Sequence, residues 1–131
     1  MFSEEYKNDS NRLSKLIIGC AIEVHKTLGP GLLESTYEKC LCYELSTNHL
    51  HFEKQLNMPV KYKEILIESG FRLDILIEDK VITELKSVET LLSVHKAQLK
   101  TYLKLSNHWL GLLLNFNSAV MKNGTERIVW G

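Results

Sequence analysis

The chain has 131 residues, of which 44% are apolar and 24% are charged, as in an ordinary single globular domain. Its 16 basic and 16 acidic residues give a formal net charge of zero, which excludes a global basic field that would attract a polyanion. No apolar run reaches the roughly 18 residues that a membrane-spanning helix needs. Cys20, Cys40 and Cys42 lack zinc-binding spacing, and we expect reduced thiols in a cytoplasmic protein.

The first third of the chain predicts two helices. Residues 1–9 are polar and are expected to be a frayed terminus. Asp9 or Ser10 can cap a helix that runs to the glycine–proline break at residues 29–31. Its apolar residues recur at helical spacing and are expected to form one buried stripe: Leu13, Leu16, Cys20, Val24 and Leu28. A second helix is expected at about residues 32–48.

The rest of the chain predicts strands on both sides of a third helix at about residues 93–105. Short runs rich in β-branched residues predict strands at 56–62, 65–68, 71–77, 81–86, 109–116 and 126–130. This order predicts a mixed α/β (α+β) fold, with a central mixed sheet flanked by helices in a single domain over residues 1–131.

An acidic residue interrupts the apolar run at residues 71–77. Because side chains alternate between the faces of a strand, Leu73, Ile75 and Ile77 are expected on one face and Asp74 on the other. If the following turn is centred on Asp79, antiparallel pairing places Asp74 directly opposite a carboxylate of the next strand.

That carboxylate is Glu84, and Lys86 follows it on the same face of the strand. Two facing carboxylates destabilise a sheet unless a cation lies between them, and oxygen ligands suit Mg²⁺ or Mn²⁺. A nearby lysine can hold a water or an anionic oxygen, as metal-assisted phosphodiester hydrolysis requires. The alternative is a solvated, salt-bridged face with no function.

The helices add further polar candidates. On a helical wheel, Glu34 points toward the core side of the second helix and Glu38 lies about 40° further out. Glu34 is therefore expected to approach Asp74 more closely, although a first-turn acid can also simply stabilise a helix dipole. On the third helix, Gln98 and Tyr102 share one side with His95, either as site residues or as the polar margin of an amphipathic helix.

The residues from Gly31 to Glu38 carry the pattern G-x-x-E-x-x-Y through Gly31, Glu34 and Tyr37. With Ile22–Gly31, Asp74, Glu84–Lys86, His95–Tyr102 and Gly111–Asn117, the chain resembles the GxxExxY protein family over about residues 13–130. That family is placed in the PD-(D/E)XK nuclease-like superfamily, whose restriction-endonuclease-like core is α-β-β-β-α-β.

The resemblance implies a nuclease-like domain with an active metal site, and we interpret the chain as a metal-dependent nuclease that uses Mg²⁺ or Mn²⁺ and acts on DNA rather than RNA. No membrane association is expected, because no apolar run is long enough. Asp74 and Glu84 match the metal-binding acids, with Glu34 or Glu38 completing the metal site. Lys86 and Gln98 match further catalytic positions. Three more residues are expected to line the site: Tyr37, His95 and Tyr102. Two alternatives remain, a non-catalytic binding module with the nuclease fold and an RNA-directed hydrolase. A homodimer is a reasonable expectation for a duplex substrate.

Overall fold

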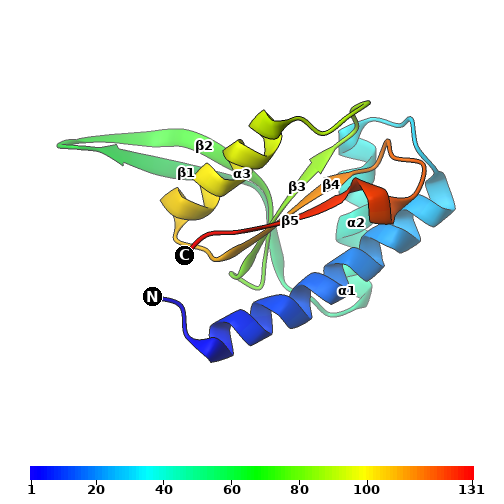
Figure 1. Cartoon of the computed structure of the whole chain (residues 1–131), viewed down its shortest axis with the longest axis horizontal. Coiled ribbons are helices and arrows are strands. Elements are labelled where there is room, and N and C mark those ends of the chain that lie inside the picture. The colour runs from blue at the N-terminus through cyan, green and yellow to red at the C-terminus, as the bar shows by residue number, and fades with distance from the viewer.

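The computed structural model describes all residues from 1 to 131 as a mixed five-stranded sheet with helices on both faces (Figure 1). The helices are α1 (Glu4–Leu28), α2 (Glu34–Thr47), α3 (Ser93–Ser106) and the short 3-10 helix η1 (Met121–Gly124). The strands are β1 (Phe52–Tyr62), β2 (Ile65–Ile77), β3 (Val81–Lys86), β4 (Leu110–Asn115) and β5 (Thr125–Val129). The α+β fold class predicted from the sequence is confirmed.

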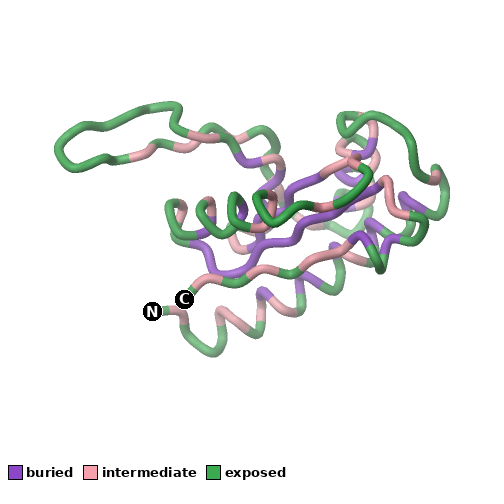
Figure 2. Tube along the Cα trace, turned by 45° about the horizontal axis from the view of Figure 1, so that its top comes forward, coloured by how far each residue is buried: buried purple, intermediate pink, exposed green.

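The strands lie in the order β1-β2-β3-β4-β5, and only β3 and β4 are parallel neighbours. Helix α3 makes the crossover between these two strands, as a parallel pair requires. Two apolar clusters fill the space between the sheet and its helices. The larger lies between the sheet and helices α1 and α2, and the smaller lies between the sheet and helix α3. Strands β3 and β4 are buried along almost their whole length (Figure 2) and form the rigid centre of the molecule. None of the helices combines the length and hydropathy needed to cross a bilayer.

Helix α1 begins earlier than the sequence suggested, so the expected frayed terminus at residues 1–9 is wrong for residues 4–9. Ser3 caps the helix by accepting a hydrogen bond from the Tyr6 backbone N–H. Ser10 lies inside the helix, where its hydroxyl donates to the Tyr6 carbonyl oxygen. Leu16 and Leu28 were expected in the buried stripe but are both 39% exposed, because Ile17 and Ala21 complete the stripe instead.

The strands expected at residues 65–68 and 71–77 form one continuous strand, β2. Ser69 and Gly70 look like a break in the sequence, but Gly70 serves a close approach between strands. A Cβ added to Gly70 would lie 2.2 Å from Val60 Cγ2 on β1. The β1–β2 register shifts beside this contact, between Met58 and Val60, and the strands remain paired on both sides of the shift.

The expectation that Leu73 shares a face with Ile75 and Ile77 is also wrong. Ile75 and Ile77 pack in the cluster of α1 and α2, whereas Leu73 packs in the cluster beneath α3. Between Leu73 and Ile75 lies Asp74, and the opposing position on β1 is Gln55, which has a φ of 51°. This left-handed backbone conformation interrupts the alternation of side chains, so the two strands exchange faces at Gln55 and Asp74.

Candidate metal and active site

The candidate site lies where β2 and β3 separate. The backbone register pairs Ile75 with Thr83, Leu76 with Ile82 and Ile77 with Val81, and is therefore centred on Asp79 as the sequence predicted. One residue beyond the last backbone pair, the strands diverge. Asp74 and Glu84 occupy this point, one on each strand, so both carboxylates face the gap between the strands.

Each of the two carboxylates bridges to the backbone of the other strand. The Asp74 N–H donates to Glu84 Oε2, and the Leu85 N–H donates to Asp74 Oδ2, both at 2.9 Å between nitrogen and oxygen. These bonds replace the backbone pairing that has just ended. Asp74 Oδ1 and Glu84 Oε1 take no hydrogen bond from the protein. One oxygen of each carboxylate is therefore free to bind a ligand.

Both carboxylic acids hold their protons more tightly than usual. Burial raises the pKa of Glu84 to about 8, and the negative charges of Asp74 and Glu34 add to the effect of burial. Burial also raises the pKa of Asp74, although the Leu85 N–H and the positive charges of Lys86 and Arg72 oppose it. Ionisation of both acids is therefore unfavourable in the protein alone, and a bound cation would favour their charged forms.

Lys86 lies at the end of β3, and its charge lowers the pKa of both acids against the effect of burial. Its backbone carbonyl accepts a hydrogen bond from the Phe116 N–H at 2.9 Å, which fixes the end of the strand. The Lys86 side chain is half-buried and has no ion-pair partner within 4 Å. Its ammonium group is thus close enough to act electrostatically on Asp74 and Glu84.

Helix α2 approaches the site with its N-terminus. Tyr37 is fully buried, and its hydroxyl donates to the Gly29 carbonyl at 2.5 Å and accepts from the Leu32 N–H at 3.1 Å. Ser87, just after β3, donates to the Leu32 carbonyl at 2.8 Å. These contacts fasten the loop before α2 to the end of β3. Tyr37, which was expected to line the site, instead holds the α1–α2 loop in place.

The two candidate third acids lie one helical turn apart on α2. Glu34 is exposed, so its expected direction toward the core is wrong, because the first turn of α2 extends beyond the apolar cluster. Its charge nevertheless contributes to the raised pKa of Glu84. Glu38 is half-buried, and its Oε2 accepts a hydrogen bond from Gln55 Nε2 at 2.8 Å. The choice between Glu34 and Glu38 as a ligand remains a prediction.

Helix α3 covers the opposite side of the site. The charges of Glu84 and Asp74, after burial, raise the pKa of Tyr102, which places its hydroxyl within their electrostatic range. Its ring stacks on Phe71 of β2 at 4.8 Å between centroids. Gln98 lies one turn earlier and is exposed. His95 caps the helix, since its Nδ1 accepts from the Leu92 N–H at 3.0 Å.

The donor set fits a small divalent cation only in part. Two carboxylates with one free oxygen each suit Mg²⁺ or Mn²⁺, which keep several waters and take further ligands from phosphate. However, the chain contains no group of three or more His, Cys, Asp or Glu side chains arranged to hold a metal ion. A third protein ligand would therefore require movement of the Glu34 or Glu38 side chain.

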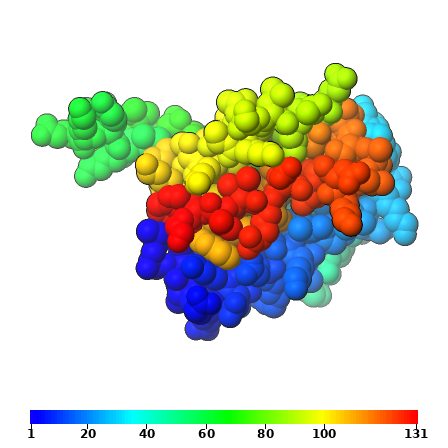
Figure 3. Space-filling view, viewed as in Figure 1, coloured from blue at the N-terminus to red at the C-terminus, as the bar shows by residue number.

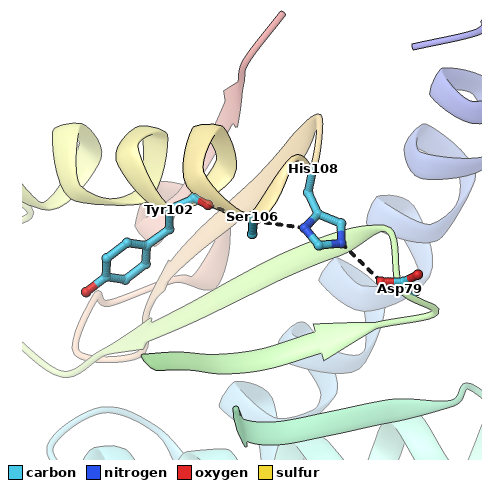
Figure 4. Close-up of polar contacts among 4 residues, drawn as sticks. All are labelled: Asp79, Tyr102, Ser106 and His108. Carbon is cyan, nitrogen blue, oxygen red and sulfur yellow. Dashed lines mark hydrogen bonds and ion pairs between the residues drawn. The ribbon is translucent and has the colours of Figure 1, made fainter. Parts of the chain in front are cut away.

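A second polar cluster lies at the other end of the β2–β3 hairpin (Figure 4). His108 contacts Ser106 Oγ through Nδ1 at 2.8 Å and Asp79 Oδ1 through Nε2 at 3.1 Å. Ser106 in turn donates to the Tyr102 carbonyl at 2.7 Å. In Figure 4 the Tyr102 ring extends away from this cluster. The cluster fastens the end of α3 to the turn at Asp79 and so helps to fix the helix that carries Tyr102.

The fold is consistent with the restriction-endonuclease-like core of a nuclease domain. The family model of the PD-(D/E)XK nuclease superfamily matches residues 11–128, and the chain belongs to this superfamily. No curated protein and no solved structure matches the chain. The narrower resemblance to the GxxExxY family stays a prediction, carried by Gly31, Glu34 and Tyr37.

Three residues near the site were not found by reading the sequence. Gln55 contacts Glu38 and adopts the positive φ opposite Asp74, Arg72 acts electrostatically on Asp74, and Asn115 supports the segment after β3. The buried Asn115 side chain accepts from the Val88 N–H at 3.1 Å and donates to the Val88 carbonyl at 2.9 Å. Only Asn115 carries a sequence signal, as a polar residue at the end of an apolar run.

Proposed function

We propose that the protein is a metal-dependent nuclease that hydrolyses phosphodiester bonds in DNA. The observation that carries the proposal is the pair Asp74 and Glu84, which face each other at a break in the sheet with raised pKa values and one free oxygen each. Membership of the PD-(D/E)XK nuclease superfamily supports the reaction class.

In this proposal Asp74 and Glu84 hold Mg²⁺ or Mn²⁺, and Glu34 or Glu38 completes the set. When bound, the cation polarises a phosphate oxygen and offsets its negative charge. Water attacks phosphorus, and the bond to the leaving oxygen breaks to give a phosphomonoester and a hydroxyl group. Lys86 orients the attacking water or stabilises charge that develops on the phosphate.

Residues of α3 would then contact the substrate. Gln98 is exposed on the turn before Tyr102 and can donate to a phosphate or a water. His95 is a weaker candidate for substrate contact, because Nδ1 already caps the helix. A chain of this size covers few base pairs, so we propose a homodimer on duplex DNA. The three free thiols support a reducing compartment such as the cytoplasm.

The competing proposal is a binding module that keeps the fold without catalysis. Two observations favour it, namely the formal net charge of zero and the lack of a third acid placed to hold a metal ion together with Asp74 and Glu84. An enzyme that acts on nucleic acid usually has a more basic surface. On helix α3, the positive charge of Lys96 is in addition paired with Glu126, at 3.4 Å between Nζ and Oε1.

The deciding experiment is a cleavage assay of the purified chain on end-labelled single- and double-stranded DNA and on RNA of the same sequence. Each is incubated with Mg²⁺, with Mn²⁺ or with a chelator. We expect metal-dependent cleavage of DNA that Asp74→Asn abolishes. Asp79→Asn is the matched control, since it makes the same chemical change on the same hairpin outside the site. Preferential cleavage of RNA would support the RNA-directed alternative, and no cleavage of any substrate would favour the binding module.

A further inference from the structure

Arg72 lies on β2, where the β1–β2 hairpin joins the body of the molecule. The distal part of that hairpin projects away from the body (Figures 1 and 3), and every residue from 61 to 70 is exposed. Packing begins at Phe71, whose ring stacks on Tyr102 of α3 at 4.8 Å between centroids, and Leu73 is fully buried. The backbone of Arg72 is therefore held between two packed neighbours, while Arg72 itself is exposed.

The strand register sets Arg72 against Lys86 across the gap between β2 and β3. Backbone pairing of the two strands ends at Ile75 and Thr83. Continued outward by three residues along each strand, the same register sets Arg72 on one side of the gap and Lys86 on the other. The positive charges of both side chains lower the pKa of Asp74 against the effect of burial, so both lie within electrostatic range of that carboxylate. The gap thus has the two acids at its inner end and two cations further out.

The two cations are not neutralised within the protein. Neither Arg72 nor Lys86 has a carboxylate oxygen within 4 Å. The guanidinium of Arg72 donates no hydrogen bond, whereas that of Arg127 donates to Asn11 and lies over the Trp109 ring. Two like charges on opposite strands are unfavourable unless a counter-charge lies between them. For Arg72 and Lys86 that counter-charge is an anion.

A phosphate group fits this position. The planar guanidinium of Arg72 can donate two parallel hydrogen bonds to phosphate oxygens, and the ammonium group of Lys86 supplies a point charge. A phosphodiester that reaches a cation between Asp74 and Glu84 has to place its anionic oxygens in the same gap. The formal net charge of zero gives no global attraction for a polyanion, so binding of nucleic acid depends on local contacts of this kind.

We propose that Arg72 is a substrate-binding residue, which together with Lys86 holds the phosphate backbone of a nucleic-acid strand beside Asp74 and Glu84. The chemistry of the two cations identifies the ligand as a phosphate ester, and its identification as nucleic acid rests on the proposed function. The positive charge of Arg72 attracts phosphate and repels a metal ion. Removing this charge should therefore weaken oligonucleotide binding and leave Mn²⁺ binding unchanged or tighter. Loss of a purely structural contact would weaken both.

The test measures binding of labelled DNA and RNA oligonucleotides to the full chain by fluorescence anisotropy, in buffer with a chelator and over a range of salt concentration. The parent should bind at least one of them, with an affinity that falls as salt rises. Arg72→Ala should raise the dissociation constant about tenfold and reduce the slope of its salt dependence by about one, because one phosphate contact is lost. Arg72→Lys should keep the slope and recover part of the affinity, since the charge remains without the planar fork.

Arg12→Ala is the matched control for Arg72→Ala. Arg12 is an exposed arginine on α1, outside the gap between β2 and β3, so its removal makes the same chemical change elsewhere on the surface. It should leave the dissociation constant and the salt slope nearly unchanged. Calorimetry with Mn²⁺ measures metal binding of the same variants, and circular dichroism checks that each variant keeps the fold.

The proposal is overturned if the parent binds no oligonucleotide, or if Arg72→Ala and Arg12→Ala have equal effects. It is also overturned if Arg72→Ala weakens Mn²⁺ binding as much as oligonucleotide binding. Calorimetry with inorganic phosphate separates the two sources of the ligand, because binding of inorganic phosphate that depends on Arg72, without binding of any oligonucleotide, would reject a nucleic-acid backbone.

Oligonucleotide binding is measured without metal, so this inference and the proposed function can fail separately. Binding that depends on Arg72 in a chain that cleaves no substrate would support the inference and contradict the nuclease. Metal-dependent cleavage that Arg72→Ala leaves unchanged in KM and kcat would support the nuclease and contradict the inference.

Discussion

The β2–β3 hairpin carries a polar cluster at each end, and the two clusters differ in how their charges are balanced. At the turn, Asp79, His108 and Ser106 form a chain of contacts that ends on a backbone carbonyl. At the open end, Asp74 and Glu84 bring together two like charges, and both pKa values are raised. The first cluster is complete within the protein, whereas in the second the protein alone leaves ionisation of both acids unfavourable. Under the proposed function a bound cation would offset that charge, so we expect the first cluster to act in stability and the second in catalysis.

Among the variants that test the difference between the two clusters, Lys86→Ala is expected to have the largest effect, a loss of cleavage. In the proposed mechanism its ammonium group acts on the water or on the phosphate charge of the transition state, so cleavage should fall by roughly 100-fold or more. Metal binding should remain, because Lys86 is not one of the proposed ligands. The measurement is the cleavage rate, together with the shift in melting temperature caused by Mn²⁺. Lys80→Ala on the same hairpin is the control and should cleave at the parent rate. Parent-rate cleavage by Lys86→Ala would rule out the proposed mechanism.

The next effect concerns pH. The pKa of Glu84 in the folded state, about 8, lies above its ordinary value of 4.5, so the folded protein retains this proton over that interval. The free energy of unfolding of the metal-free protein should therefore fall as pH rises from about 4.5 to about 8. One pKa unit corresponds to about 1.4 kcal/mol, so the interval from 4.5 to about 8 amounts to about 5 kcal/mol at most. Glu84→Gln should therefore stabilise the metal-free protein by up to about 4 kcal/mol at pH 8 and by little at pH 5.

Denaturant unfolding of the parent and Glu84→Gln at both pH values measures this effect. Glutamine keeps an acceptor for the Asp74 N–H, so the substitution removes mainly the charge. A parent protein whose stability does not change over this interval, or a Glu84→Gln variant that is destabilised at pH 8, would show that Glu84 is not under electrostatic stress.

A smaller effect is expected at the turn cluster. His108→Ala removes a buried side chain and its contacts with Ser106 and Asp79, and should lower the free energy of unfolding by about 1–2 kcal/mol. The Asp79 carboxylate is itself well exposed, which limits the contribution of the ion pair. Cleavage should stay within a few-fold of the parent rate. A loss of cleavage as large as that of Lys86→Ala would break the distinction between the two clusters.

The smallest effect is expected at Thr83, next to Glu84 on β3. Its side chain is fully buried, and Oγ1 has no hydrogen-bond partner. Valine has nearly the same shape without the unsatisfied hydroxyl, so Thr83→Val should raise the free energy of unfolding by up to about 1 kcal/mol. Thermal denaturation measures the change. Destabilisation would mean that the hydroxyl has a partner in solution.

The sequence predicted the hairpin register well, because the alternation of side chains and the turn at Asp79 are local signals. It failed where an outcome depends on residues distant in sequence. In the sequence Gly70 suggests a break between strands, but in the fold it allows Val60 of the neighbouring strand to approach closely. Leu73 lies on the other face of the sheet because of the backbone conformation of Gln55 on β1. Likewise, Glu34 was misplaced because a helical wheel does not show where the core ends along the helix axis.

The most direct test of the central claim is Mn²⁺ binding to the parent, Asp74→Asn and Asp79→Asn at pH 8, measured by calorimetry and by melting temperature. We predict that Mn²⁺ binds to the parent and to Asp79→Asn and raises the melting temperature of both, since binding to the folded state stabilises it. Asp74→Asn should lose binding and should melt at or above the temperature of the metal-free parent, because repulsion of Glu84 is relieved. Equal Mn²⁺ responses of Asp74→Asn and the parent, or no binding to either, would contradict the assignment of Asp74 and Glu84 as a cation site.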